Sequence, residues 1–167
     1  MIKLRPASIN DLELLKYWDK QQHVIDCDPD DEWNWEVELQ RHPAWREQLM
    51  AELDRVPIGF VQIINPFLEE THYWGEVDPN NRAIDIWIGE KYNLSKGYGT
   101  TMMRLAIQRC FEDEQVEGIL IDPLKSNVKA HRFYERLGFE FLREQRFGGS
   151  LCYVYRLNRA HSSFVDH

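Results

Sequence analysis

The sequence has few cysteines, no long apolar run and fewer basic than acidic residues. Its three cysteines, Cys27, Cys110 and Cys152, are an odd number without paired spacing. They predict reduced thiols rather than a disulfide framework. No apolar stretch is long enough to cross a membrane, and the N-terminus lacks the apolar segment of a secretion signal. We therefore expect a cytoplasmic protein with no membrane partner.

The excess of acidic residues also restricts the kind of partner. With 28 Asp and Glu against 20 Lys and Arg, the formal net charge is −8. Nucleic-acid affinity depends on basic side chains that neutralise phosphates, so a nucleic-acid partner is disfavoured. An acidic surface either attracts cations or simply keeps the protein in solution. The six histidines lack ligand-like spacing, so we expect no metal site.

Length and composition predict one folded domain. The chain has 167 residues, of which 43% are hydrophobic, enough for a sizeable core. It contains no internal repeat, low-complexity tract or Ser/Gly linker. We therefore expect a single domain over residues 1–167, with a frayed tail at 159–167.

Hydrophobic periodicity predicts strands alternating with helices. Helix-like spacing covers 8–20, about 98–112 and 126–138, and an acidic loop opens at residue 26. Strand-like runs occupy 2–7, 45–53, 58–65, 82–89, 117–124, 139–147 and 150–158. In 82–89 the isoleucines alternate with Asp85 and Trp87, which places these two side chains on the opposite face. The order predicts a mixed α/β sheet with crossover helices in its second half.

A glycine turn with the sequence KGYGT, residues 96–100, opens directly into the second of these helices. A helix N-terminus presents unpaired N–H groups, and glycine allows a ligand to approach the backbone closely. The turn is not a Walker loop, and Met102 replaces the third glycine of a dinucleotide fingerprint. Taken alone, it fits an anion site or an ordinary tight turn equally well.

The residues around this turn carry a more specific resemblance. The segment SNVKAHRFYERLGF (126–139) follows the next strand. Together with the KGYGT helix, it resembles the GNAT family of acetyl-CoA-dependent N-acetyltransferases. The stretch EVDPNNRAIDIWIGE (76–90) is similar to aminoglycoside 6′-N-acetyltransferases and their relatives. The resemblance extends from about Pro57 to Phe139. It implies a GNAT-like, mostly antiparallel central sheet with helices on both faces.

The resemblance implies acetyl-CoA as co-substrate. The turn would hold the pyrophosphate, the preceding strand would hydrogen-bond the pantetheine arm, and two helix residues would flank it. The corresponding residues here are Leu94, Ser95, Lys96, Gly97, Tyr98, Gly99 and Thr100 in the turn, Ile86, Trp87 and Ile88 in the strand, and Asn127 and Ala130 in the helix. The family usually has Arg or Gln where Leu94 stands, so we expect weaker acetyl-CoA affinity.

Two side chains match the family's catalytic positions. Asp85 would attract and orient an ammonium; with an ordinary pKa near ~3.9 it can act as a base only through a raised pKa or through water. Spacing alone favours a solvated or salt-bridged strand aspartate, paired with Arg82, and the resemblance reverses this preference. Tyr134 would protonate the leaving thiolate, and from spacing alone it fits a core tyrosine. We further expect the Ile88 amide to polarise the thioester carbonyl.

Acidic residues predict a cationic acceptor. Glu70, Asp78, Asp85 and Asp122 are expected to bind it, and with Glu76 to gather at the strand ends. The acidic loop, residues 26–32, either covers the site or is an ordinary solvated surface. Cys27-Asp28 and Gly148-Gly149-Ser150 depart from the aminoglycoside enzymes, and Trp33 or Trp35 would compensate by packing on a sugar ring.

The leading hypothesis is therefore direct transfer of acetyl from acetyl-CoA to a primary amine, an aminoglycoside 6′-amine first, in a ternary complex. A siderophore-type hydroxylamine, a polyamine or a protein amine is an alternative acceptor. A non-catalytic acyl-CoA-binding module is the alternative from another class, because it needs the turn but neither Asp85 nor Tyr134. We expect a monomer or homodimer.

Overall fold

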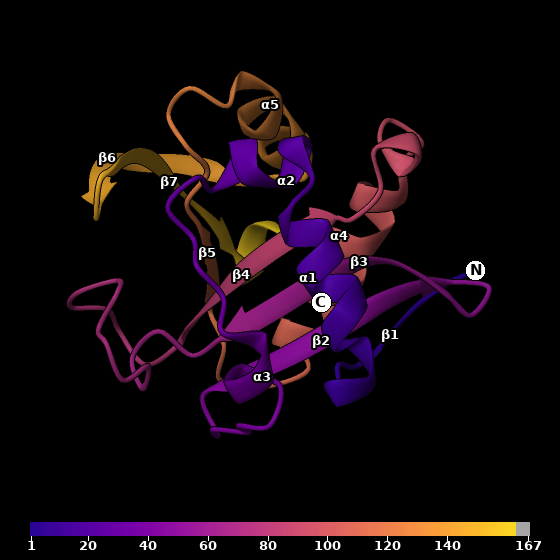
Figure 1. Cartoon of the computed structure of the whole chain (residues 1–167). Coiled ribbons are helices and arrows are strands. Elements are labelled where there is room, and N and C mark those ends of the chain that lie inside the picture. Colours follow the sequence, from indigo (N-terminus) through magenta and orange to yellow (C-terminus); the bar gives the residue numbers. More distant parts are fainter. Residues whose placement is uncertain (163–167) are drawn as a thin grey trace.

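Seven strands form one mixed sheet that runs through the molecule (Figure 1). The computed structural model describes residues 1–162. The strand order is β1-β2-β3-β4-β5-β7-β6, and among the strands of residues 1–162 only the β4–β5 pair is parallel. The predicted mostly antiparallel sheet is thus confirmed. The strands are β1 (Ile2–Pro6), β2 (Arg46–Leu53), β3 (Val56–Ile64), β4 (Asn81–Ile88), β5 (Gly118–Ile121), β6 (Glu140–Phe147) and β7 (Ser150–Asn158).

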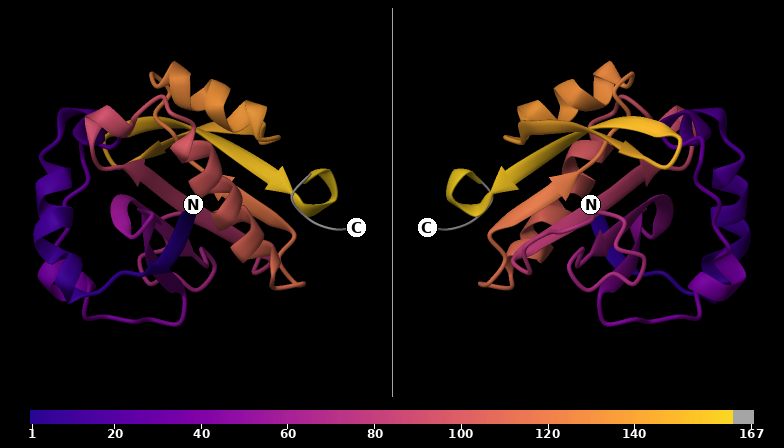
Figure 2. Two further views of the ribbon diagram at one scale, coloured as in Figure 1. Left: turned by 90° about the vertical axis from the view of Figure 1, so that its right-hand side faces the viewer. Right: turned by 90° about the vertical axis from the view of Figure 1, so that its left-hand side faces the viewer.

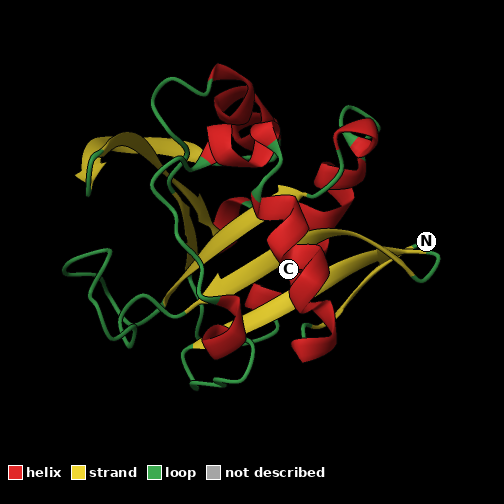
Figure 3. Ribbon diagram, viewed as in Figure 1, coloured by secondary structure: helices red, strands yellow, loops and turns green. Residues whose placement is uncertain are grey.

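Helices flank the sheet (Figure 3). The α-helices are α1 (Leu12–Asp19), α2 (Gln22–Cys27), α3 (Trp35–Glu38), α4 (Tyr98–Phe111) and α5 (Val128–Arg136), and short 3₁₀ turns η1 (Ile9–Asp11), η2 (Lys91–Asn93) and η3 (Arg159–His161) accompany them. Helices α1, α4 and α5 confirm the helices predicted over 8–20, about 98–112 and 126–138. None of the helices within residues 1–162 has the length and apolar character needed to cross a bilayer.

Hydrophobic clusters lie on both faces of the sheet. On one face, Met102, Met103 and Ile107 of α4 are fully buried against the strands. On the other face, Trp18 of α1 and Trp35 of α3 are buried with Phe60 of β3. Figure 2 shows α1 and α4 on opposite sides of the sheet. Helices therefore cover both faces, as predicted.

The end of β4 is packed tightly under α1. A Cβ atom added at Gly89 would lie only 2.0 Å from the Trp18 ring, so glycine alone permits this approach. The Trp18 Nε1 also donates to Glu90 Oε1 at 3.3 Å. These contacts fix the end of β4 relative to α1, which lies over the same face of the sheet as the Asp85 side chain.

The predicted frayed tail is wrong in its first part. Residues Arg159–His161 form η3, and the Arg159 guanidinium donates to the carbonyls of Val116 at 2.7 Å and Phe111 at 3.0 Å. These bonds hold the segment against the end of α4. The remainder of the prediction, for residues 163–167, lies outside the described residues.

Candidate active site

The parallel pairing of β4 with β5 stops early, which leaves part of β4 unpaired on that side. β5 pairs only with Asn81–Ala83, whereas β3 pairs with β4 up to Ile88. The Gly89 N–H donates to the Ile58 carbonyl. Because backbone direction alternates along a strand, Trp87 directs its N–H and C=O toward β3, and Ile86 and Ile88 direct theirs toward the β5 side. Two of the three predicted strand residues thus present backbone groups on the unpaired side.

A histidine that the sequence analysis missed reaches this edge. His23 of α2 lies 2.8 Å from the Ile88 carbonyl oxygen through its Nε2, and since a carbonyl only accepts, the ring donates. The contact joins α2 to the unpaired part of β4. It uses the Ile88 carbonyl and not the Ile88 N–H, which points to the same side of the strand. No spacing in the sequence links residues 23 and 88, so only the tertiary fold reveals this pair.

The glycine turn forms the N-terminus of α4. Gly97 is the N-cap residue, with φ +83 and no side-chain cap, and Ser95 also has positive φ at +61. The first backbone N–H groups of the helix therefore have no partner within it. Gly99 lies beside Ile88 of β4 and Phe133 of α5, whose side chains are 3.7 and 3.8 Å from an added Cβ. Lys96, which directly precedes Gly97, is exposed to solvent. These groups fit an anionic phosphate.

Asn127 and Ala130 have a structural role in α5. The Asn127 Oδ1 caps the helix by accepting from the Ala130 N–H at 3.2 Å. The Asn127 Nδ2 lies 3.9 Å from the Cys27 Sγ, so α2 and α5 meet here. Cys27 is exposed, but partial desolvation by its neighbours, and then the charges of Asp26 and Asp28, raise the pKa of its thiol. The thiol is thereby kept protonated, which disfavours Cys27 as a nucleophile.

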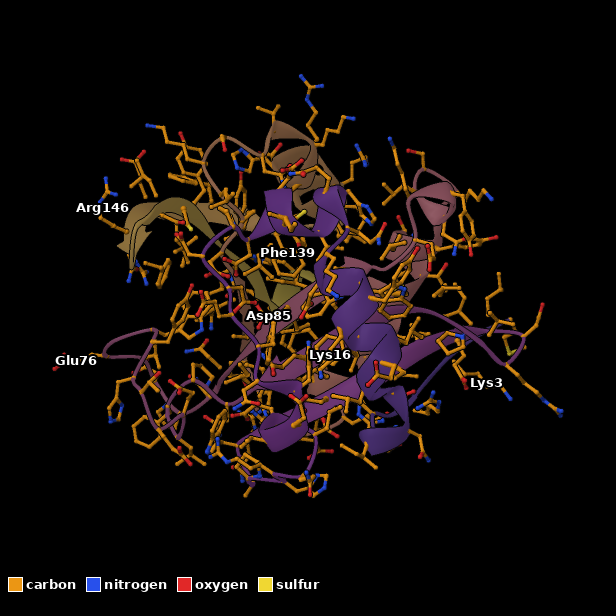
Figure 4. The ribbon with its side chains drawn as sticks, in the orientation of Figure 1. Lys3, Lys16, Glu76, Asp85, Phe139 and Arg146 are labelled. Atoms are coloured by element: carbon orange, nitrogen blue, oxygen red, sulfur yellow. The ribbon has the colours of Figure 1, made fainter. Side chains whose placement is uncertain are left out.

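Asp85 and Asp122 form the centre of an acidic group (Figure 4 labels Asp85). The pKa of Asp85 is raised to about 6, because burial and the charge of Asp28 together outweigh the lowering effect of a hydrogen bond donated by Gln62. Burial and then the charge of Asp85 hold the pKa of Asp122 well above its usual range. The Tyr73 hydroxyl donates to Asp122 at 2.5 Å. The two carboxyls lie close enough for the ionisation of one to oppose that of the other.

The acidic loop faces the same centre. Desolvation, followed by the charges of Asp28 and Asp85, raises the pKa of Asp31 to about 7. Asp30 hydrogen-bonds the Ser150 hydroxyl, which ties this loop to the turn between β6 and β7. The loop begins after α2, so Asp26 lies in the helix rather than in the predicted loop. The loop thus links α2 to the hairpin beside the acids.

Tyr134 borders the acidic group from α5. Burial, and then the charges of Asp85 and Asp122, raise the pKa of its phenol above the ordinary value near ~10. The phenol therefore remains protonated near neutral pH. It can donate a hydrogen bond to a developing thiolate, but complete proton transfer to a thiolate with a pKa near ~8.5 is more uphill than the ordinary values indicate.

The other predicted acceptor-binding acids lie elsewhere. Glu70 pairs with Arg41 at 2.9 Å on an exposed loop. Glu76 and Asp78 line a separate open hollow together with Arg143 and Arg156. Figure 4 shows Glu76 at the periphery, far from Asp85. The structure therefore gathers Asp85 and Asp122 at one centre, but it does not bring Glu70, Glu76 and Asp78 to it.

An aromatic cluster lies next to Asp85 on the same face of the sheet. Trp87 stacks on Phe60 and Trp33 stacks on Trp35, each with ring centroids 4.5 Å apart. Trp35 is only 1% exposed and donates to Asp19, so it belongs to the core and cannot pack on a sugar ring. Trp33 is partly buried and remains able to contact a ligand.

The raised pKa of Asp122 predicts a pH-dependent change in stability. A carboxyl whose pKa is higher in the folded state stabilises the protein below its unfolded pKa, near ~3.9, and this stabilisation is lost as the pH rises through the folded value. We expect Asp122→Asn to raise the melting temperature by about 2–4 °C at pH 8 and to leave it unchanged near pH 4. Calorimetry of both proteins at the two pH values tests this. A variant that melts lower than the parent at pH 8 would contradict it.

Within the described residues, no group of three or more His, Cys, Asp or Glu side chains is arranged to hold a metal ion. The acids at the centre are instead accompanied by tyrosines and amides. Such a set suits an organic cation, which several carboxylates can bind without the tight shared coordination that a metal demands.

Comparison with known proteins shows the same architecture. The family model described as an acetyltransferase (GNAT) domain matches residues 8–147. The chain is 31% identical over 153 residues to the aminoglycoside N(6′)-acetyltransferase type 1 of Klebsiella pneumoniae, covering 83% of this chain and 74% of that relative. Over a shorter stretch of 87 residues, 49% of this chain and 57% of that relative, it is 32% identical to the spermine/spermidine N(1)-acetyltransferase of Bacillus subtilis.

A solved structure agrees over nearly the whole chain. The aminoglycoside acetyltransferase AAC(6′)-Ib in complex with coenzyme A and kanamycin superposes with a TM-score of 0.85 at 27% identity. The match covers 96% of each chain. The similarity therefore includes the first helices and the last hairpin, beyond the span on which the sequence resemblance depended.

Proposed function

The chain belongs to the GNAT family of acetyltransferases, and from this premise we propose that it transfers the acetyl group of acetyl-CoA to the 6′-amine of an aminoglycoside. The observation that carries the proposal is the acidic centre of Asp85 and Asp122 beside the unpaired edge of β4. An aminoglycoside carries several ammonium groups, which such a centre attracts. The similarity to enzymes that act on aminoglycosides supports the same acceptor.

In this proposal the backbone holds the co-substrate. The first N–H groups of α4, with Gly97 at the cap and Lys96 and Ser95 before it, bind the pyrophosphate. Ile86 and Ile88 offer their backbone groups on the unpaired side of β4 to the pantetheine arm, and Asn127 and Ala130 flank it at the start of α5. Acetyl-CoA supplies the acetyl group as a thioester.

Asp85 has the central role in the proposed reaction. Its carboxylate attracts the ammonium and, with a pKa of about 6, accepts a proton from it more readily than an ordinary aspartate, directly or through water. The freed amine attacks the thioester carbonyl carbon, the carbon–sulfur bond breaks to release the CoA thiolate, and the second proton that the nitrogen loses as the amide forms passes to that thiolate or to water. The Ile88 N–H polarises the carbonyl, and Tyr134 donates a hydrogen bond to the departing sulfur. Asp122 holds a second ammonium group of the acceptor.

A panel of acceptors tests the proposal. We expect CoA release from acetyl-CoA to be fast with kanamycin or tobramycin and slow with spermidine and hydroxylamine. The physical reason is that Trp33 and the acids can together contact a sugar ring and several ammonium groups. Faster turnover with spermidine would leave the proposed acetyl transfer in place but show that the acceptor is a polyamine, in agreement with the shorter similarity to the polyamine enzyme. CoA binding without turnover on any amine would support the binding-module alternative.

A further inference from the structure

Three polar side chains form a row across the sheet that ends at Asp85. Gln48 of β2 lies directly opposite Gln62 of β3, and Gln62 lies directly opposite Asp85 of β4. The Gln48 Nε2 donates to Gln62 Oε1 at 3.2 Å, and the Gln62 Nε2 donates to Asp85 Oδ2 at 2.9 Å. The adjacent row on these strands, Met50, Phe60 and Trp87, is apolar.

The burial of Gln62 makes this row unusual. Gln62 is only 4% exposed and stands in the apolar run of β3. A buried amide is costly unless its polar atoms are hydrogen-bonded. Because an ionised carboxylate only accepts, Gln62 must turn its Nε2 toward Asp85 and its Oε1 toward Gln48. The direction of every hydrogen bond in the row is thereby fixed by Asp85.

We propose that Gln62 is a positioning residue that holds the Asp85 carboxyl group in its catalytic orientation and ionised form, and that Gln48 fixes the orientation of the Gln62 amide. This inference rests on the proposed role of Asp85 in the transfer. One carboxylate oxygen, Oδ2, is occupied by Gln62, so Oδ1 is left for the acceptor amine.

The surroundings of Asp85 explain why such a donor is needed. The groups that act on it electrostatically are Asp28 and Asp31 of the acidic loop, Asp122 after β5, Tyr73, and Tyr134 of α5. All of them are acidic, and within residues 1–162 no ion pair joins Asp85 to a lysine or arginine. Burial and the negative charges of the carboxylates favour the protonated form of Asp85, whereas the two phenols stay neutral near pH 7. Donation from Gln62 opposes them, because a hydrogen bond to a carboxylate favours its charged form.

The test is a pH profile of Gln62→Met, which keeps the length of the side chain and removes the donor. We expect the acidic limb of kcat/KM to move upward by about one to two pH units, since hydrogen bonds to charged groups have this strength. The KM for acetyl-CoA should stay unchanged. Gln145→Met is the matched control, because Gln145 of β6 accepts from Arg143 away from this row, and its profile should equal that of the parent.

Two further measurements keep the outcome decisive. Gln48→Met removes only the outer amide and should shift the acidic limb of kcat/KM in the same direction by a smaller amount. This variant provides the test if Gln62→Met fails to fold. A ¹³C NMR titration of the Asp85 carboxyl, without any acceptor, should show the same upward shift in pKa. This readout separates the inference from the identity of the acceptor. Unchanged Asp85 titration in both variants would overturn the inference, whether or not catalysis is lost.

Discussion

Replacing Asp85 with asparagine is expected to lower kcat/KM for the aminoglycoside by about 10²–10⁴-fold, the usual contribution of a positioned acid or base. Asparagine has nearly the same shape, and its oxygen can still accept from Gln62. It has no negative charge to attract the ammonium and cannot take its proton. The KM for acetyl-CoA should change little, because the proposed cofactor contacts are made by backbone groups of α4 and β4.

The fold should survive this change. The substitution removes a carboxylate whose ionisation is opposed by burial, so the variant should melt no lower than the parent at pH 8. Asp54→Asn is the matched control, because Asp54 lies in an exposed turn beside the N-terminus. CoA release and thermal melting of both variants provide the measurements. An Asp85→Asn enzyme with at least a third of the parental kcat/KM would show that Asp85 is not part of the chemistry.

The second large effect is expected at the glycine turn. Gly97→Val should raise the KM for acetyl-CoA at least about tenfold while changing kcat little. The residue has φ +83, a conformation that costs a side-chain-bearing residue about 1–2 kcal/mol, so the turn must rearrange. The rearranged turn would no longer direct the N–H groups of α4 at a phosphate.

A matched control separates strain from binding in this experiment. Gly75 also has positive φ, at +70, and an added Cβ there meets nothing within 4 Å, as at Gly97. Gly75→Val should therefore cause a similar loss of stability with an unchanged KM for acetyl-CoA. Direct titration of CoA into both variants checks the comparison. Equal losses of affinity in the two would indicate general strain instead of a phosphate site at α4.

Local patterns in the sequence were sufficient to predict the elements that position the site. The alternation in 82–89 placed Asp85 and Trp87 on one face, and the structure confirms that face. The cap at Asn127 and the positive φ of Gly138 also follow from local signals that end and begin helices. These features depend on neighbours within one or two turns of the chain, which is why sequence alone reveals them.

Features that depend on distant partners could not be predicted. The Gln62–Asp85 hydrogen bond needs the register of β3 against β4, and the His23–Ile88 contact needs α2 to lie over the sheet. A polar residue within the apolar run of 58–65 was the only signal for Gln62. Glu70, Glu76 and Asp78 are close to Asp85 in sequence, yet in the loop before β4 Glu70 pairs with Arg41, and Glu76 and Asp78 line a separate hollow.

The central claim is transfer of an acetyl group to one specific amine of a cationic acceptor. The most direct measurement is NMR of the product formed from kanamycin and [¹³C]acetyl-CoA by the wild-type enzyme. We expect a single labelled amide, on the 6′-nitrogen. Labelled amides on other nitrogens, or unmodified kanamycin beside efficient acetylation of spermidine, would contradict it.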